Sequence, residues 1–353
     1  MEVLTFKIFG RHKVIMKILG IEFAPLSIPM ERRLQTVGAL HYTYAFLFFG
    51  FGMLFVFLYL LFTNYYFVPL AYLAWYFYDR DTSKHGGRRS EWVRRWSLFR
   101  WSADYFPLKL IKTHDLSPAK NYIFACHPHG VMCQSHFVNF ASEGTGFSEL
   151  FPGLQSFLCV LSGQFMFPIF REYFLLSGAV EVSRESIEWI LTKEGTGNAL
   201  AIMIGGAVEA LEAHPRSLKL KVKSRKGFCK LALKHGASIV PVFAFGENDL
   251  YEQIPNPDGS LVRRFQNFLT HLLGFSPALF HGRGIFNYTF GLLPYRKPVF
   301  TVVGAPIVVQ PVPDPSGEQI NELHETYCSE LYNLFETHKH KYGYTESDHL
   351  DYE

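Results

Sequence analysis

One long uncharged stretch constrains what this chain can fold into more than any other feature. No Asp, Glu, Lys or Arg occurs from Leu34 to Tyr78, and about 20 apolar residues suffice to cross a bilayer. Asn64 divides the stretch into two predicted helices, over 40–62 and 65–78. Basic residues flank both ends, so we predict a transmembrane hairpin with both ends in the cytosol. The second helix is short for a full span, which leaves a re-entrant hairpin as an alternative, and a buried helical pair in a soluble domain is another.

The segments beside this stretch also carry membrane signals. Residues 1–20 combine basic and apolar side chains without a small-residue cleavage site, so we predict a membrane-surface helix rather than a signal peptide. Residues 86–101 mix arginine with tryptophan, which suits the headgroup layer, with a solvated basic linker as the alternative. The predicted organisation is then a surface segment over 1–38, a hairpin over 39–79 and a cytosolic domain over 80–353.

Composition narrows the class of protein. Aromatic residues make up 17% of the 353 residues, with 35 Phe and 19 Tyr, a load that suits a protein in contact with lipid. The formal charge of +3 is too small to indicate nucleic-acid binding. The five cysteines are scattered without a CxxC pair, so neither a disulfide framework nor a zinc site is indicated.

Strand-like and helix-like patterns alternate from Asn121 onward. The predicted strands cover 122–124, 180–182, 199–204, 217–222, 238–245 and 299–303, and the predicted helices cover 184–194, 227–235 and a final amphipathic segment capped at Asp314-Pro315. This alternation predicts an α/β fold in which helices flank a sheet. A second uncharged run, Leu154–Phe170, is short and interrupted by Gly and Pro, so we expect a hydrophobic wall or a shallow membrane dip there.

The candidate site begins where the first of these strands ends. The apolar run Tyr122–Phe124 leads into His127-Pro128-His129-Gly130, where the proline and the glycine favour a turn. Two imidazoles are therefore expected at the strand-end edge where open α/β sheets place their sites. The alternative is a pair of loop histidines with ordinary hydrogen bonds.

The chemistry of this turn is narrowed by the motifs that the sequence lacks. It contains no G-x-S-x-G, H-E-x-x-H or Walker A motif. His127, His129 and His136 have no carboxylate nearby in the sequence to complete a metal site, so neither a metal nor a bound cofactor is predicted. What is left is histidine as a general base, which suits direct attack of a substrate hydroxyl on an activated acyl group.

A second cluster follows the predicted strand over 199–204. The backbone N–H groups of Gly205 and Gly206 are candidates to bind an anion or an oxyanion at a helix start. Glu209 is a candidate to bind a substrate hydroxyl or to orient an imidazole, and a carboxylate favoured only by the helix dipole is the alternative. A further set of basic residues either holds the phosphates of a nucleotide-type carrier or forms a solvated face; it comprises Lys221, Lys223, Arg225, Lys226, Arg171 and Arg283.

Taken together, these motifs resemble the monoacylglycerol and type-2 diacylglycerol acyltransferase family along nearly the whole chain. The matching segments include EFAPL at 22–26, ERRLQTVG at 31–38, DYFP at 104–107, HPHG at 127–130, GGAVEA at 205–210, FGENDL at 245–250 and GLLPYRKP at 291–298. Val208 departs from what we take to be a polar or variable position of the family.

The resemblance implies an acyltransferase-like mixed sheet on a multi-pass anchor in the endoplasmic reticulum membrane, facing the cytosol. It implies transfer of a fatty acyl group from acyl-CoA, as co-substrate, to an acylglycerol, and it matches His127 and His129 to the essential histidines of the family. We place the base on His129 and favour 2-monoacylglycerol as the acceptor. Diacylglycerol or a fatty alcohol is the alternative acceptor, and a lipid hydrolase and a non-catalytic lipid-binding hairpin are the alternative functions. The expected partners are acyl-CoA, acylglycerols and membrane lipid, without nucleic acid, and a homo-oligomer is left open.

Overall fold

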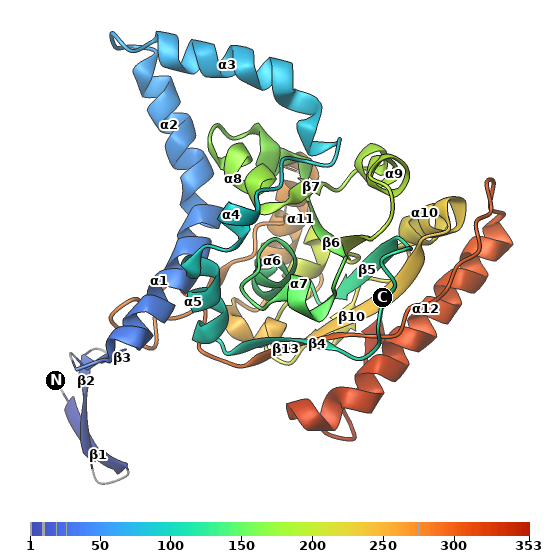
Figure 1. Ribbon diagram of the computed structural model, residues 1–353. Helices are drawn as coiled ribbons and strands as arrows, with labels where there is room; N and C mark the ends of the chain where they lie inside the picture. The colour runs from blue at the N-terminus through green and yellow to red at the C-terminus, as the bar shows by residue number, and fades with distance from the viewer. Residues whose placement is uncertain (1, 9–10, 19, 26, 274–275) are drawn as a thin grey trace.

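A seven-stranded sheet organises the body of the protein, and helices cover both of its faces (Figure 1). The computed structural model describes residues 2–8, 11–18, 20–25, 27–273 and 276–353. In spatial order the strands are β4 (Leu108–Lys112), β13 (Val299–Val303), β10 (Ser238–Phe245), β5 (Tyr122–His127), β8 (Asn198–Met203), β6 (Gln155–Val160) and β7 (Ala179–Glu181). β10 and β13 pair antiparallel, and all other neighbours pair in parallel. The predicted mixed α/β sheet is therefore confirmed.

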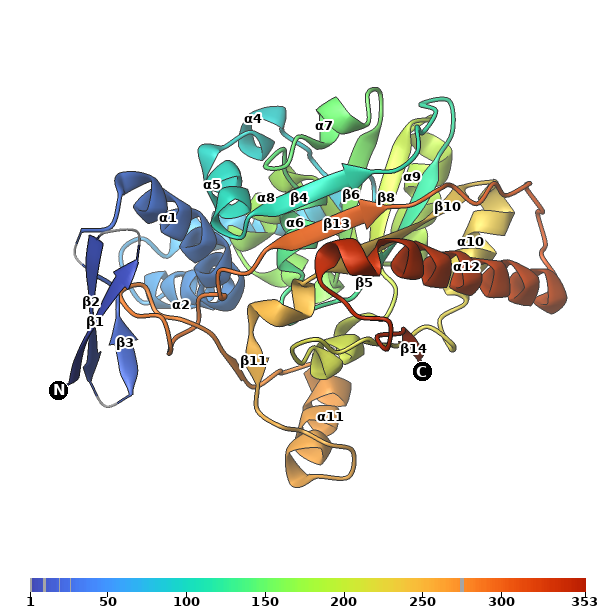
Figure 2. The ribbon, with the colours of Figure 1, turned by 90° about the horizontal axis from the view of Figure 1, so that it is seen from below.

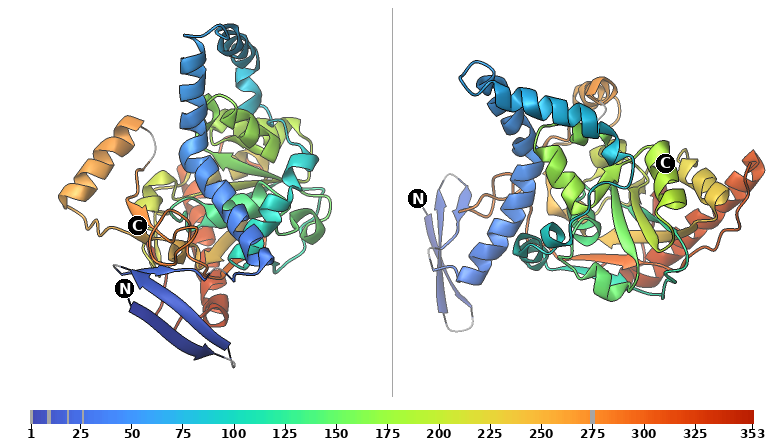
Figure 3. Two further views of the ribbon diagram at one scale, coloured as in Figure 1. Left: turned by 90° about the vertical axis from the view of Figure 1, so that its left-hand side faces the viewer. Right: turned by 45° about the horizontal axis from the view of Figure 1, so that its top comes forward.

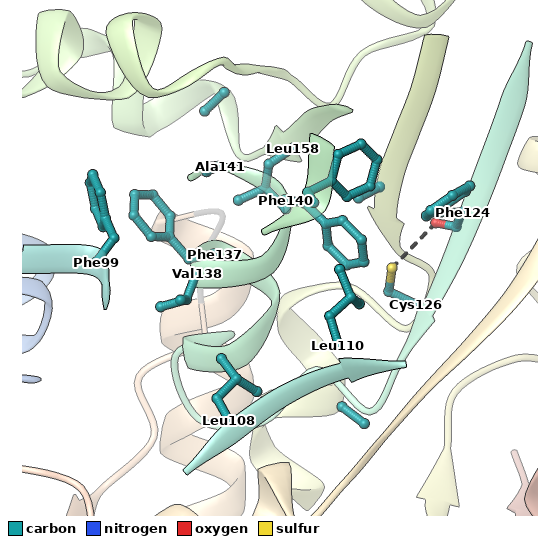
Figure 4. Packing of buried hydrophobic residues seen from close by; sticks show 14 of the residues in the cluster. Phe99, Leu108, Leu110, Phe124, Cys126, Phe137, Val138, Phe140, Ala141 and Leu158 are labelled. Carbon is teal, nitrogen blue, oxygen red and sulfur yellow. Dashed lines mark hydrogen bonds between the residues drawn. The ribbon is translucent and has the colours of Figure 1, made fainter. Parts of the chain in front are cut away.

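The central strand β5 separates two hydrophobic cores. All six of its residues are buried, which is typical of a parallel strand covered on both faces. Phe124 and Cys126 point into the core shown in Figure 4, where Phe140 lies near Phe124 and Phe137 lies beside Phe99. Ile123 and Ala125, which alternate with them along β5, point into the opposite core. The first core is covered by α5 (Ser97–Tyr105), α6 (Gln134–Phe140), α7 (Phe147–Leu150) and α8 (Phe170–Ser177), and the second by α9 (Arg184–Lys193), α10 (Gly227–His235) and α12 (Gly317–His338).

Local capping explains several of these boundaries. The Ser183 side chain accepts a hydrogen bond from the Ser186 N–H and so caps α9, as expected. Gly236, with φ of +64°, ends α10, also as expected. The helix α12 is capped by Ser316, which forms a capping box with Gln319, rather than by the predicted Asp314-Pro315.

The remaining elements are short, apart from α11. They are η2 (Arg80–Ser83), α4 (Glu91–Arg94), η3 (Ser162–Met166), η4 (Ala207–Glu212), β9 (Lys219–Leu220), η5 (Glu247–Leu250), β11 (Glu252–Gln253), α11 (Leu261–Leu273), β12 (Phe280–His281), η6 (Lys339–Tyr342) and β14 (Asp351–Tyr352). β9 pairs with β14 and covers only two residues of the strand predicted over 217–222.

The predicted N-terminal surface helix was wrong. The described residues of this segment form a three-stranded antiparallel sheet of β1 (Glu2–Ile8), β2 (Arg11–Ile18) and β3 (Ile21–Phe23) instead. These segments are rich in β-branched residues, which favour extended backbone. This small sheet lies outside the main body (Figure 2).

The uncharged stretch forms one long helix followed by a short one. The long helix runs from Met30 to Leu60 through α1 (Met30–Tyr44), η1 (Ala45–Phe49) and α2 (Gly50–Leu60), so it begins ten residues before the predicted start at 40. It is long and apolar enough to cross a membrane, and only 11% of its most apolar window is buried, unlike the core helix of a soluble domain. The second helix, α3 (Phe67–Asp79), spans about 20 Å, less than the roughly 30 Å of a hydrocarbon core.

The two helices meet at a corner, where the rings of Phe57 and Tyr72 lie 5.1 Å apart (Figure 1). The far end of α3 returns to the body, and Asp79 there accepts from the guanidinium groups of Arg88 and Arg171. One candidate spanning helix is therefore present among the described residues, and the full hairpin stays a prediction.

The first half of the second uncharged run, Leu154–Phe170, forms the strand β6 inside the protein. β6 lies between β8 and β7, with Phe157 and Leu158 buried. The expected membrane dip was therefore wrong for this strand, because its apolar residues are covered by helices on both faces of the sheet.

Candidate functional site

Three adjacent parallel strands deliver the chemically active side chains to one edge of the sheet. β5 ends at the turn His127–Gly130, β8 leads into Gly205–Glu209, and β10 leads through Gly246 to Glu247. Because the carboxyl ends of parallel neighbours meet at the same edge, residues far apart in the sequence come together there. The sequence predicted the clusters that follow β5 and β8, but not the contribution of β10.

Glu209 lies at the centre of the arrangement. It is 2% exposed, and its Oε1 accepts a hydrogen bond from the backbone N–H of His129 at 2.7 Å. Its Oε2 accepts from the backbone N–H of Lys221 at 2.9 Å and lies 3.6 Å from Nδ1 of His127. Burial alone would raise the pKa of Glu209, but the imidazole of His127 and the two N–H donors outweigh it and hold the pKa below its usual value. The ionised carboxylate therefore fixes the histidine turn.

His129 has the geometry of a general base. Its Nδ1 lies 2.9 Å from the carbonyl oxygen of Gly130, and because a carbonyl only accepts, Nδ1 carries the ring proton. The lone pair is then on Nε2, where the sulfur of Cys133 lies 3.4 Å away. Burial lowers the pKa of His129, although the Gly130 carbonyl and the Glu209 charge oppose it. The partly exposed ring is therefore neutral at pH 7 and able to take a proton.

His127 is placed differently from His129. It is completely buried, and its Nε2 lies 2.9 Å from the hydroxyl of Tyr327 on α12. With Nδ1 directed toward Glu209, the consistent assignment has Nε2 accepting from the tyrosine hydroxyl. The sequence analysis had not identified Tyr327 as a site residue, and the 200 residues between the two partners leave no local pattern to reveal the contact.

Glu247 is a second residue that the sequence analysis missed. It is 2% exposed and accepts from the backbone N–H groups of Gln134 and Ser135, at 2.8 and 3.1 Å, at the start of α6. A Cβ atom at Gly130, whose φ is +65°, would lie 2.7 Å from Glu247 Cγ, so only glycine fits the turn. The signal available in the sequence was that Glu247 closely follows the strand predicted over 238–245.

The glycines of the second cluster have distinct roles. A Cβ atom at Gly205 would overlap the carboxylate of Glu209, so this glycine makes room for it. The N–H of Gly206 donates to the carbonyl oxygen of Met203 at 3.0 Å, so it is already engaged rather than directed at an oxyanion.

Of the predicted basic residues, only some lie at this edge. Arg225 is exposed and reaches the carbonyl oxygen of Gly205 at 3.4 Å, and Lys226 bonds Asn321 at 2.7 Å. Arg171 is buried between Asp79 and Glu172, at 2.7 Å from each. Arg283 is buried over the ring of Tyr288, at 4.7 Å. The two buried arginines are therefore engaged elsewhere in the fold.

The sequence is similar to those of known proteins along most of its length. The family model described as diacylglycerol acyltransferase matches residues 58–353. The chain belongs to the diacylglycerol acyltransferase family. It is 52% identical to 2-acylglycerol O-acyltransferase 1 of Bos taurus and 49% identical to that of Homo sapiens, covering 94% of this chain and 99% of each relative.

More distant similarities were also found. The chain is 45% identical to diacylglycerol O-acyltransferase 2 of Danio rerio over 91% of this chain and 89% of the relative. The crystal structure of the 1-acyl-sn-glycerophosphate acyltransferase PlsC of Thermotoga maritima superposes with a TM-score of 0.39 at 13% identity, covering 87% of this chain and 96% of that one.

Replacing Tyr327 by phenylalanine tests how this member of the diacylglycerol acyltransferase family orients His127. The variant loses one buried hydrogen bond, so we expect the free energy of unfolding to fall by about 1 kcal/mol. We also expect kcat to fall with KM for acyl-CoA unchanged, because His127 is too buried to touch substrate. Tyr332→Phe is the matched control, since its hydroxyl meets His349 on the exposed side of the same helix. Equal kcat values for both variants would contradict the assignment.

The burial of Glu247 predicts a pH effect on stability. Burial raises its pKa from 4.5 to about 7, against the hydrogen bonds from Ser135 and Gln134. Between these pH values the unfolded chain loses a proton that the folded chain retains, so stability falls as the pH rises through this window. In Glu247→Gln we expect a flatter dependence of unfolding temperature on pH than in wild type. Exposed Glu318→Gln should behave as wild type, and parallel curves for Glu247→Gln would refute the assignment.

Proposed function

We propose that the protein transfers a fatty acyl group from acyl-CoA to a free hydroxyl of 2-monoacylglycerol, giving diacylglycerol. The observation that carries this proposal is the neutral His129, whose Nε2 holds the lone pair while Glu209 fixes its backbone. The names of the relatives that share about half of the sequence over almost their whole length favour the same reaction and acceptor.

The mechanism needs one base and no protein nucleophile. Nε2 of His129 takes the proton of the glycerol hydroxyl as its oxygen attacks the thioester carbonyl carbon. The new C–O bond forms, the C–S bond breaks, and the proton on His129 passes to the departing CoA sulfur. Glu209 acts by holding the His129 backbone, and His127 by linking Glu209 to Tyr327. For the oxyanion, backbone N–H groups near Gly130 or Gly205 are the candidates.

The phosphates of acyl-CoA are assigned to two basic residues beside the site, the exposed Arg225 and the partly exposed Lys226. Arg225 and Lys226 lie on the segment that follows β9 and reaches back to Gly205. Arg171 and Arg283 are left out of this assignment, because both are buried with partners of their own. Arginine matches phosphate oxygens through two parallel hydrogen bonds, so Arg225 is the stronger candidate of the two.

An apolar groove offers a place for an acyl chain. It has a volume of about 720 Å³ and lies between the long N-terminal helix on one side and the helices α4 and α8 on the other. Phe48, Met53 and Tyr173 contribute to its lining, and Glu172 is its acidic member. Because the same helix is the candidate membrane span, a chain in this groove would lie at the boundary of the bilayer.

We further place the protein in the endoplasmic reticulum membrane as a hairpin, with the site facing the cytosol. Basic residues at both ends of the uncharged stretch support this topology. A glycan on the sequon Asn287-Tyr288-Thr289 would contradict it, because that segment leads to Tyr295, whose N–H donates to Leu250 at the end of η5.

The deciding experiment offers three acceptors in parallel. Membranes containing the protein receive labelled oleoyl-CoA with 2-monoacylglycerol, diacylglycerol or a fatty alcohol. We expect labelled diacylglycerol from the first acceptor. Triacylglycerol or wax ester from the other acceptors alone would change the acceptor and keep acyl transfer. Loss of acyl-CoA without any acceptor would indicate a hydrolase, and no reaction at all would favour a lipid-binding protein.

A further inference from the structure

The helix α11 has its polar face turned inward and its apolar face turned outward. On this helix Leu261, Phe265 and Phe268 are 81%, 59% and 62% exposed, whereas Arg263 and Gln266 are 7% and 1% exposed. A surface helix of a globular protein normally buries its apolar face. This inversion indicates that the outward apolar face contacts an apolar environment rather than water.

Specific contacts hold the polar face against the body. The guanidinium of Arg263 pairs with Glu212 and, at 3.2 Å, with Asp258. The amide of Gln266 accepts from Asn256 at 2.9 Å and donates to the carbonyl oxygen of Pro277 at 3.1 Å. Because these side chains fix the rotation of the helix, the exposed phenylalanines do not result from a loosely packed segment.

The charge of α11 indicates what lies against the apolar face. The helix carries Arg263 and Arg264 and contains no Asp or Glu, and Arg264 is exposed beside the apolar face. A second copy packed on this face would bring cations together without a carboxylate from the helix to pair them. Lipid phosphates provide that pairing, and a helix with Phe and Leu on one side and arginine at its edge is typical of a membrane surface.

We propose that α11 lies in the headgroup layer of the membrane, with Leu261, Phe265 and Phe268 inserted and Arg264 on the lipid phosphates. The helix projects from the body (Figure 2; Figure 3, left) as a contact separate from the α1–α2 helix. It is also joined to the site, because Glu212 ends the segment η4 that carries Glu209, and Asn256 donates to the carbonyl oxygen of Leu211 at 3.2 Å. Membrane contact at α11 and the position of Glu209 are thereby linked through hydrogen bonds.

Depth-dependent fluorescence quenching tests the proposal with a readout that does not depend on acyl transfer. The full-length protein is reconstituted in nanodiscs of phosphatidylcholine and phosphatidylserine, with or without brominated acyl chains. Phe268→Trp is compared with Asn267→Trp, an exposed position of the same helix outside the apolar face, and the signal of the five native tryptophans is subtracted. Neither residue belongs to the site, so retained acyl transfer confirms that both variants fold.

We expect the added fluorescence of Phe268→Trp to be lost in brominated lipid and to be insensitive to acrylamide in the water. Asn267→Trp should show the opposite behaviour. Quenching of both tryptophans by acrylamide alone would overturn the proposal, since α11 would then face solvent. Protection of Phe268→Trp from both quenchers would also overturn it, because the face would then be covered by protein.

Discussion

Alanine in place of His129 should lower kcat for acyl transfer by about 10²- to 10⁴-fold, the usual contribution of a general base. The imidazole is partly exposed and makes its described polar contacts only within its own turn, to Gly130 and Cys133. Its removal therefore leaves the sheet and the Glu209 contact to the backbone N–H intact. Acyl transfer from labelled oleoyl-CoA measures the effect, with His114→Ala as the control at an exposed histidine.

The pH dependence provides a second test of His129. Because burial lowers its pKa below that of free histidine, the base is protonated only in acid. We expect kcat/KM to rise with pH through this lowered pKa and to be level at neutral pH. Near-normal turnover by well-folded His129→Ala would show that another group is the base.

Alanine in place of Gly205 should be the most damaging single-methyl change in the site. The added Cβ would overlap the Glu209 carboxylate, which must then leave the N–H groups of His129 and Lys221. Each donor left unsatisfied costs about 1–3 kcal/mol. We expect the free energy of unfolding to fall by at least the cost of one such donor. We also expect loss of acyl transfer, because Glu209 no longer holds the backbone of the histidine turn.

Two further variants make this test specific. Gly227→Ala adds the same methyl group at a helix position with nothing within 4 Å, so it should be neutral. Glu209→Gln retains one acceptor and should fall between wild type and Gly205→Ala in stability. Equal stability of the Gly205→Ala and Gly227→Ala variants would show that Glu209 is not held as described.

Local patterns predicted most of the sheet and the histidine edge. β10 and β13 match the predicted ranges residue for residue, because short apolar runs bounded by turns are typical of buried strands. The N-terminal segment was mistaken for a helix because basic and apolar residues mix in the same way in both structures, and only β-propensity separates them.

The site was predicted only as far as contacts are local in sequence. His127, His129 and Glu209 follow strands and could be placed at an edge. Tyr327 and Glu247 reach the same turn from distant elements, and a single sequence does not encode which helix position faces which strand end. The burial of Arg171 against Asp79 was missed for the same reason, since Asp79 ends a helix 92 residues earlier.

The contact between His127 and Tyr327 also sets an order of events during synthesis. The two residues are separated by 200 positions, which a ribosome translating 5–20 residues per second covers in about 10–40 s. The long apolar helix and the histidine turn leave the ribosome first, and Tyr327 follows. A chain interrupted in that interval would therefore carry the candidate spanning helix and the histidine turn but would lack the tyrosine that holds His127.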